Sequence, residues 1–258
     1  MKVVIFAGGL GTRISEESHL KPKPMIEIGD KPMLWHIMKI FSSQGFNDFV
    51  ICLGYKGYVI KEYFTNYFLH SSDVTIELKD NKVHVHNSTA EDFKVTLVDT
   101  GLNTKTAGRL QRIRQHVEGN DFILTYGDGL ADIDLKQLLK FHNSHNKIAT
   151  VSAIQPVGRF GVLHINDDSS VDVFKEKVKG DEGWINGGFF VLRPGVFNCL
   201  PPDADDVMWE DTPLQTLAKN DELMAYQHNG FWKCMDALRD KVELEEMWNS
   251  GNAKWKIW

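Results

Sequence analysis

Cysteine is scarce in this sequence, and no apolar stretch is long. The 258 residues include three cysteines, Cys52, Cys199 and Cys234, which form no CxxC pair and leave an odd number. This pattern disfavours a disulfide framework and favours three packing residues in a reducing compartment. The apolar run at residues 3–7 is too short for a secretory signal or a membrane span. The sequence therefore predicts a cytoplasmic protein that does not enter the membrane.

Positive charge is not in excess, and low-complexity tracts are missing. The formal net charge is −6, and 42% of the residues are hydrophobic. A protein that binds nucleic acid by neutralising phosphates needs the opposite charge balance, so a nucleic-acid partner is disfavoured, whereas local basic sites for small anions are not. The apolar fraction is sufficient for the core of one α/β domain of this length.

Apolar runs alternate with helical spacing along the chain. Runs typical of strands buried on both faces lie at residues 3–6, 49–53, 122–126 and 148–153. Helical spacing covers residues 33–41, 59–67, 108–117 and 134–145, and a hairpin is expected around residues 80–81. This order predicts an α/β fold with a Rossmann-like, mixed but mostly parallel sheet, and residues from 161 onward are expected to be β-rich.

A glycine-rich segment follows the first expected strand. Gly8, Gly9 and Gly11 let backbone N–H groups approach a phosphate chain closely, and Arg13 and Lys23 supply cations for it. A tight turn with a solvated basic face is the alternative interpretation. The motif GxxxxGK[ST] is absent, and Ile14 stands where GxGxxG needs its third glycine. A nicotinamide-dependent oxidoreductase is therefore disfavoured.

Two aspartates and one loop are further candidates. Asp128 directly follows a buried strand, where open α/β sheets bind ligands. Asp236 precedes an expected helix over residues 237–249, so it is either a metal ligand or the cap of that helix. The loop at residues 100–109 is either an ordinary surface connection or a reader of a nucleobase, with Arg109 contacting a phosphate or a base carbonyl.

Three other features are expected to be structural. His84 and His86 share a strand face but have no third metal ligand nearby in the sequence, and His36 is expected to be a satisfied core or interface histidine. The carboxyl-terminal residues 255–258 include Trp255 and Trp258, which is unusual for a solvated terminus. Packing against a neighbouring subunit would explain this tail.

Several motifs together resemble a known family. The segment AGGLGTR at residues 7–13, followed by Lys23-Pro24, is similar to the signature of the sugar-nucleotide pyrophosphorylases. The segments LWHIM, GYKG, VDTG, TYGDG, INGGFF and FWKCMD, which begin at residues 34, 54, 98, 125, 185 and 231, narrow the resemblance to the glucose-1-phosphate cytidylyltransferases. The resemblance extends over essentially the whole chain.

The resemblance implies a reaction and the residues that perform it. CTP and glucose 1-phosphate would give CDP-glucose and pyrophosphate by in-line attack on the α-phosphorus, with Mg²⁺ held by Asp128 and Asp236 and with Arg13 and Lys23 as the catalytic cations. The implied nucleotide-binding residues are Phe6, Ala7, Gly8, Gly9, Leu10, Gly11, Thr12, Arg13, Lys23, Thr104, Arg109 and Gly127. The implied sugar-phosphate-binding residues are Glu176, Lys177, Lys179, Asn186 and Gly187. Lys105, Ala107 and Val178 depart from the family pattern as it is expected here.

The resemblance also implies an organisation. Residues 1–258 would form one domain, with 1–130 mainly binding nucleotide and 131–258 mainly binding sugar and forming a homo-oligomer that is trimer-based or hexameric. The product would enter dideoxysugar synthesis for lipopolysaccharide O-antigen. Two alternatives remain: the same chemistry with dTTP, UTP, GTP or another sugar 1-phosphate, and a non-catalytic regulator that binds nucleotide sugars.

Overall fold

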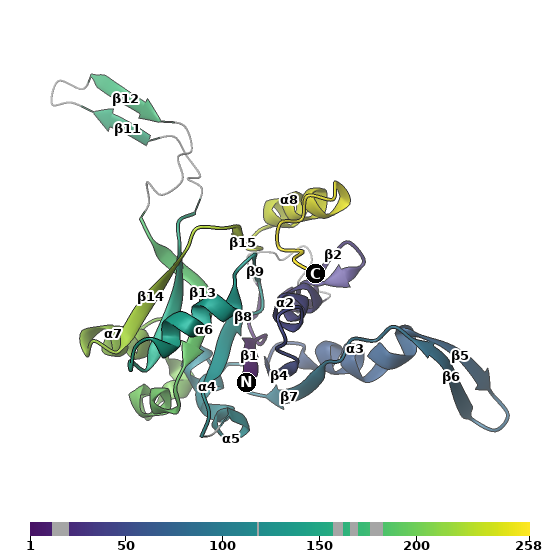
Figure 1. Cartoon of the computed structure of the whole chain (residues 1–258). Coiled ribbons are helices and arrows are strands. Elements are labelled where there is room, and N and C mark those ends of the chain that lie inside the picture. Colours follow the sequence, from purple (N-terminus) through teal and green to yellow (C-terminus); the bar gives the residue numbers. More distant parts are fainter. Residues whose placement is uncertain (12–20, 118, 157–161, 166–169, 176–182) are drawn as a thin grey trace.

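A seven-stranded sheet forms the centre of the protein (Figure 1). The computed structural model describes residues 1–11, 21–117, 119–156, 162–165, 170–175 and 183–258. The strand order is β14 (Leu223–His228), β10 (Ala149–Ile154), β13 (Ile185–Leu192), β8 (Phe122–Tyr126), β1 (Lys2–Phe6), β4 (Asp48–Leu53) and β7 (Lys94–Asp99). All neighbouring pairs are parallel except the two that involve β13. The predicted mixed, mostly parallel sheet is therefore confirmed.

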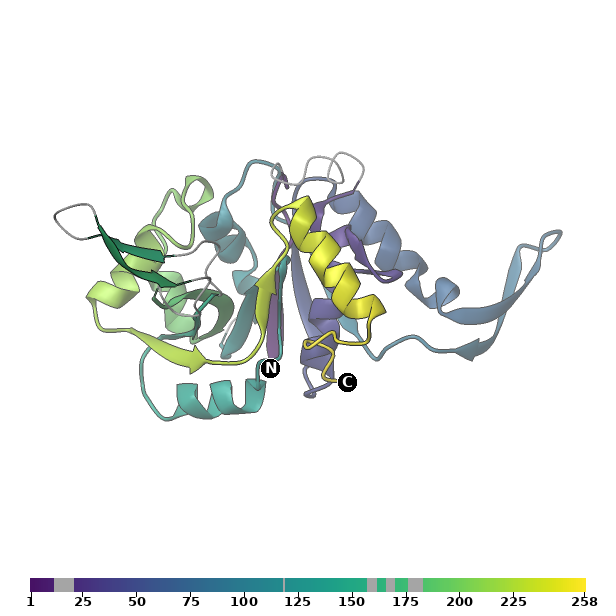
Figure 2. The same cartoon turned by 90° about the horizontal axis from the view of Figure 1, so that it is seen from above.

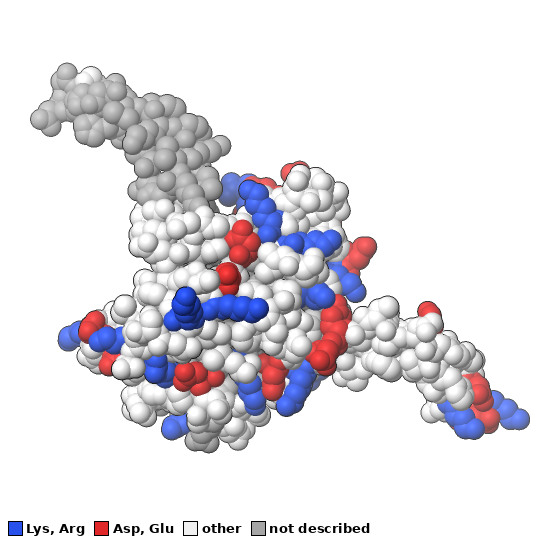
Figure 3. All heavy atoms as spheres, viewed as in Figure 1, with Lys and Arg blue, Asp and Glu red and all other residues white. Residues whose placement is uncertain are grey.

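Helices cover both faces of this sheet, which Figure 2 shows from above. In β1, Val3 and Ile5 belong to one buried cluster, while Val4 and Phe6 belong to the other, because successive side chains point to opposite faces. The first face packs against α2 (Met33–Ser42), α3 (Gly57–His70), α6 (Leu135–Asn143) and α8 (Leu238–Asn249). The second packs against α4 (Thr106–Arg112), α5 (Arg114–Val117) and α7 (Thr212–Lys219). Charges of both signs intersperse over the outer face seen in Figure 3.

Helix boundaries differ in detail from the prediction. α2 starts at Met33, as the helical spacing predicts, and Pro32 takes the N-cap position without a side-chain cap. Asp134 does cap α6, since its carboxylate accepts a hydrogen bond from the N–H of Gln137 at 3.0 Å. The single helix expected over residues 108–117 is divided at Ile113 into α4 and α5.

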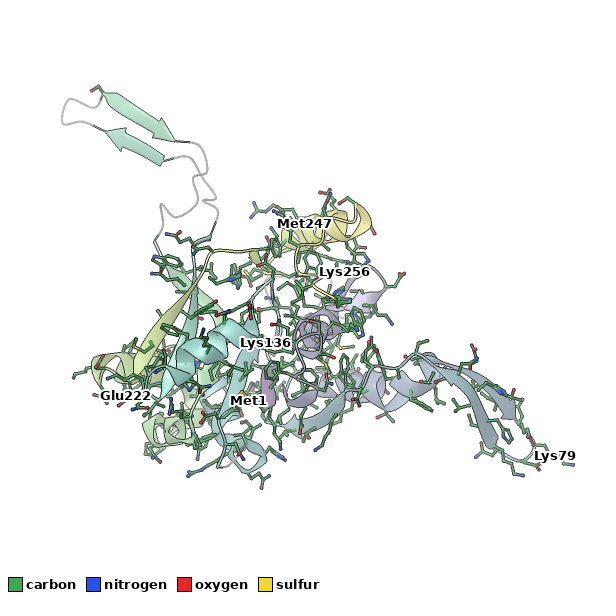
Figure 4. The ribbon with its side chains drawn as sticks, viewed as in Figure 1. Met1, Lys79, Lys136, Glu222, Met247 and Lys256 are labelled. Carbon is green, nitrogen blue, oxygen red and sulfur yellow. The ribbon has the colours of Figure 1, made fainter. Side chains whose placement is uncertain are left out.

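Within the described residues, four small antiparallel pairs lie outside the main sheet. They are β5 (Ser72–Glu77) with β6 (Lys82–Ser88), β9 (Gly129–Ala131) with β15 (Trp232–Cys234), β2 (Glu27–Ile28) with β3 (Lys31–Pro32), and β11 (Val162–Ile165) with β12 (Val171–Lys175). The same part of the chain contains the short 3-10 helices η2 (Lys23–Met25), η3 (Pro194–Cys199) and η4 (Ala204–Asp206). The β5–β6 hairpin projects from the body, with Lys79 at its tip (Figure 4).

The aromatic tail packs within its own chain, so the burial of Trp255 is explained without a neighbouring subunit, and contact of the tail with such a subunit stays a prediction. Trp255 is fully buried and stacks on Phe231, with ring centroids 5.8 Å apart. Trp258 meets the edge of Trp35 in α2 at 5.8 Å. His36, also in α2, is buried between these rings, and one of its ring nitrogens lies 2.8 Å from the carbonyl of Ile28. The turn after α8 brings the tail onto α2, which sequence spacing does not reveal.

The cysteines and the lengths of the helices were the remaining features predicted from composition. All three cysteines are free, and Cys52 is buried in the core as a packing residue. In the described part of the chain, no helix combines the length and the apolar character that a membrane span requires.

Candidate nucleotide-binding site

A cavity of about 510 Å³ opens beyond the carboxyl ends of β1 and β8, the position at which open α/β sheets bind ligands. It is lined by Phe6, Ala7, Gly8, Gly9, Leu10, Gly11, Lys23, Pro24, Leu102, Asn103, Thr104, Lys105, Thr106, Arg109, Tyr126, Gly127, Asp128 and Met208. Every described residue of the predicted nucleotide-binding set is therefore at this cavity. Thr12 and Arg13 lie outside the described residues.

Arg109 holds the glycine segment in place. Its buried guanidinium donates to the carbonyls of Gly8 at 3.0 Å, Leu53 at 2.9 Å and Gly101 at 2.9 Å, and to the hydroxyl of Thr100 at 2.7 Å. A Cβ at Gly8 would lie 2.2 Å from Nη1 of Arg109, so only glycine allows this approach. Burial lowers the pKa of Arg109. The guanidinium therefore clamps three backbone segments of the cavity wall, and its predicted contact with nucleotide stays a prediction.

Lys23 joins the two candidate aspartates. Its ammonium donates to Oδ2 of Asp128 at 2.7 Å and to Oδ1 of Asp236 at 2.8 Å. Burial of Lys23 opposes its charge, but the two carboxylates outweigh that effect, so the pKa of Lys23 is raised above its usual 10.5. Groups separated by 105 and 213 residues thus converge at one point beside the glycine segment.

The β9–β15 pair creates this convergence. Asp128 directly precedes β9 and Asp236 lies two residues after β15, and the N–H of Met235 donates to the carbonyl of Asp128 at 2.9 Å. Pro24, which follows Lys23 in η2, is buried close to Gly127. The three charged groups are therefore positioned by backbone pairing and by a buried proline.

Asp236 does not cap α8, so that alternative was wrong. The N-cap position of α8 belongs to Ala237. The carboxylate of Asp240, one turn into the helix, accepts from the N–H groups of Asp236 at 3.0 Å and Ala237 at 2.9 Å. Because the N-cap is Ala237, the carboxylate of Asp236 is not used as a cap and faces Lys23.

Comparison with known proteins shows the family to which a chain with this site belongs. Residues 2–246 match the family model described as Nucleotidyl transferase. The chain belongs to the nucleotidyl transferase family. It is 56% identical to a glucose-1-phosphate cytidylyltransferase of Salmonella typhimurium and 45% identical to a probable glucose-1-phosphate cytidylyltransferase of Bacillus subtilis, each over 100% of both chains. Among solved structures it is similar to HddC from Yersinia pseudotuberculosis, with a TM-score of 0.68, 25% identity and coverage of 96% of this chain and 99% of that chain.

Two of the predicted sugar-site residues of this nucleotidyl transferase, Asn186 and Gly187, lie in β13, and Asn186 contacts the cavity-lining Tyr126. The side-chain amide of Asn186 donates to the hydroxyl of Tyr126 at 3.3 Å, and the carbonyl of Gly187 accepts from the indole N–H of Trp232 at 2.7 Å. A Cβ at Gly187 would lie 2.7 Å from Oγ of Ser152, which explains the glycine. The other three predicted sugar-site residues, Glu176, Lys177 and Lys179, lie outside the described residues.

Sequence reasoning missed two lining residues. Tyr126 was placed only at the end of a strand, although its position beside Gly127 and Asp128 was a usable signal. Met208 reaches the cavity from the segment after η4, and no local pattern marks it. The ring of His84 lies 2.7 Å from Oε1 of Glu77, and the ring of His86 lies 2.9 Å from the hydroxyl of Thr75.

Proposed function

We propose that this chain transfers the cytidylyl group of CTP to glucose 1-phosphate, giving CDP-glucose and pyrophosphate. The glucose-1-phosphate cytidylyltransferase of Salmonella typhimurium is 56% identical to this chain over the full length of both. The proposal depends on one observation: Lys23 lies between Asp128 and Asp236, beside a cavity that is lined by the glycine segment. Such a site can hold a triphosphate and a cation together.

The reaction needs positioning more than acid–base chemistry. A phosphate oxygen of the sugar phosphate forms a bond to the α-phosphorus of CTP, the bond from that phosphorus to the bridging oxygen breaks, and pyrophosphate leaves with the bonding electrons. The attacking phosphate is already ionised at neutral pH, so no general base is needed. Backbone N–H groups of Gly8, Gly9 and Gly11 would hold the phosphates, and Lys23 and Arg13 would offset their charge.

The site fits Mg²⁺. The oxygens of Asp128 and Asp236 already share one cation, the ammonium of Lys23, so the pair accommodates positive charge. Mg²⁺ prefers one or two carboxylates together with water and phosphate oxygens, and in the described residues no larger cluster of metal-ligating side chains occurs. When held by Asp128 and Asp236, the metal would supply positive charge that offsets the charge developing on the phosphates. Lys23 would then be available to a phosphate oxygen.

The experiment is a panel of CTP, UTP, dTTP and GTP with glucose 1-phosphate, with and without Mg²⁺, followed by pyrophosphate release. We expect turnover with CTP to exceed turnover with the other three and to require the metal. Higher turnover with another nucleotide would assign the same chemistry to that nucleotide. Binding of nucleotide without any pyrophosphate release would instead support a non-catalytic regulator.

The hairpin β5–β6 supports homo-oligomer formation as part of the proposal. In its register Val74 faces Val85 and Ile76 faces Val83, so all four lie on one face, and Ile76 and Val83 are 55% and 48% exposed. Leu78, at the turn, is 87% exposed. A second copy of the chain is the occupant we propose for this face, in a trimer-based or hexameric assembly. A cytoplasmic location and the use of CDP-glucose for dideoxysugars of O-antigen stay predictions.

A further inference from the structure

A hydrogen-bonded network runs behind the cavity from the sugar side to the nucleotide side. Tyr126 donates its hydroxyl hydrogen to Oε1 of Glu210, and Asn186 donates to the same hydroxyl oxygen at 3.3 Å. On the other side, the hydroxyl of Thr106 donates to Oε2 of Glu210 at 2.9 Å and accepts from the N–H of Trp209 at 2.7 Å. One carboxylate thus bonds to both walls of the site.

The two walls are otherwise separate parts of the chain. Tyr126 ends β8 beside Gly127 and Asp128, whereas Thr106 begins α4 and belongs to the loop expected to meet the base. Both line the cavity, and Glu210 stands behind them between η4 and α7. A change in the position of either wall therefore reaches the other through Glu210.

The ring of Tyr126 packs against two aromatic rings, and its hydroxyl bonds to two side chains. Its ring meets Phe190 edge-on, with centroids 6.0 Å apart, and lies 6.1 Å from Phe6. The hydroxyl of Tyr126 donates its hydrogen to the carboxylate of Glu210. The lone pairs of the oxygen then point toward Asn186 and the sugar side.

The segment around Glu210 also braces the nucleotide wall. The carbonyls of Asp205 and Val207 accept from the N–H groups of Lys105 at 2.8 Å and Ala107 at 3.1 Å. These backbone bonds hold the loop in any variant of Glu210, because they do not involve its side chain. Substitution of the carboxylate therefore tests the network without removing the loop's own support.

We infer that Glu210 is a positioning residue that couples the two substrates: nucleotide held against the Thr106 wall orders Tyr126 and Asn186 for the sugar phosphate, and the reverse. The inference rests on the proposed function, since it takes the Asn186 side as the sugar site. Coupling between ligands is reciprocal, so each should raise the affinity of the other by the same factor.

The test is calorimetric titration of glucose 1-phosphate into the full chain, with and without a saturating CTP analogue whose α,β-bridge is methylene. We expect the analogue to tighten sugar-phosphate binding by roughly fivefold to tenfold in the unchanged protein. In Glu210→Ala this factor should fall to about one, because the side chain that bonds to both hydroxyls is removed. Each ligand alone should bind within about twofold of its original affinity. A retained coupling factor in Glu210→Ala would overturn the inference.

Further variants separate coupling from general damage. Tyr126→Phe and Thr106→Val should each abolish the coupling, and Thr106→Ser should retain it because the hydroxyl remains. Tyr63→Phe is the matched control, since the buried hydroxyl of Tyr63 makes no hydrogen bond in the described structure. If Thr106→Ser and Thr106→Val lose the coupling equally, the hydroxyl is irrelevant and the inference fails. If the protein without substitutions releases no pyrophosphate from CTP, the proposed function is refuted instead. The coupling would then be measured with the other nucleotides.

Discussion

Two small antiparallel strand pairs in this chain differ in burial and in their distance from the candidate site. The β5–β6 hairpin is built from residues close in the sequence, and β6 is exposed along its whole length. The β9–β15 pair joins segments about a hundred residues apart, and Leu130 and Ala131 in β9 are fully buried. The hairpin meets no part of the candidate site, whereas the β9–β15 pair sets the positions of Asp128 and Asp236.

This difference shows which strand pair can hold catalytic side chains in precise positions. A two-stranded hairpin alone in water is marginally stable, so it holds side chains loosely. The β9–β15 pair is fixed by the core beneath it and by α8, whose Leu244 is buried in the same cluster as Leu130. A phosphoryl-transfer site needs such rigidity because small misplacements of charged groups cost large factors in rate.

The largest expected effect is at the aspartates. Asp128→Asn should lower turnover by about a thousandfold, because it removes a charge from the proposed metal site, while nucleotide affinity changes by less than tenfold. Pyrophosphate release and nucleotide titration measure the two quantities. Asp73→Asn is the matched control, because Asp73 is a carboxylate of the β5–β6 hairpin that accepts from the amide of Asn87 at 3.1 Å. The turnover of this variant should stay within about twofold of that of the original protein. Near-normal turnover in Asp128→Asn would discard the metal role.

The next effect concerns the packing that anchors α8 and the tail. Burial lowers the pKa of His36 from 6.5 to about 4. The unfolded chain therefore binds a proton near pH 6.5 that the folded chain does not bind until about pH 4, and the free energy of unfolding should fall by about 3 kcal/mol as the pH drops through that window. Urea unfolding at pH 7, 6, 5 and 4 measures it.

The control for this pH dependence is His36→Gln, which cannot be protonated and should show a shallower loss of stability with acid. Burial also lowers the pKa of His142 to about 4, so part of the loss will remain in the variant. Identical slopes in the two proteins would exclude His36 as a source.

A smaller effect is expected at Trp232 of β15. Trp232→Phe keeps an aromatic ring but removes the N–H that bonds to the carbonyl of Gly187, so kcat/KM for the sugar phosphate should fall by about tenfold. Trp35→Phe removes a similar indole bond, to Tyr67 at 2.9 Å and Glu91 at 3.0 Å near the base of the hairpin, and should leave kcat/KM unchanged. Equal losses in both variants would remove the distinction between the two pairs.

The smallest effect on chemistry is expected in the hairpin. Ile76→Lys combined with Val83→Lys should leave turnover per site within about twofold, because neither residue lines the cavity. The same variant should reduce the mass measured by light scattering, since lysines on this face oppose its burial against a second copy. An unchanged mass would remove the support that this face gives to oligomer formation, and a large loss of turnover would break the contrast between the hairpin and the β9–β15 pair.

Much of the fold was predictable from local patterns. The run of residues 122–126 gave the bounds of β8 directly, and the alternation around Asp80 and Asn81 gave the β5–β6 hairpin. β9 and β15 were not predicted, because three-residue strands show no periodicity of their own and exist only through their partner. The cap proposed for Asp236 failed for a related reason: α8 starts one residue later, with Ala237 at its N-cap, and sequence alone does not fix that boundary.

The sequence by itself determined the order of strands and helices, the buried runs and the glycine segment beside Lys23, since these depend on neighbours within a few residues. Only the tertiary structure decided that Lys23 lies between Asp128 and Asp236, and that Glu210 bonds to both walls of the cavity. The physical reason is distance along the chain: a contact across 84 to 213 residues depends on how the sheet and its helices pack, which no local period encodes.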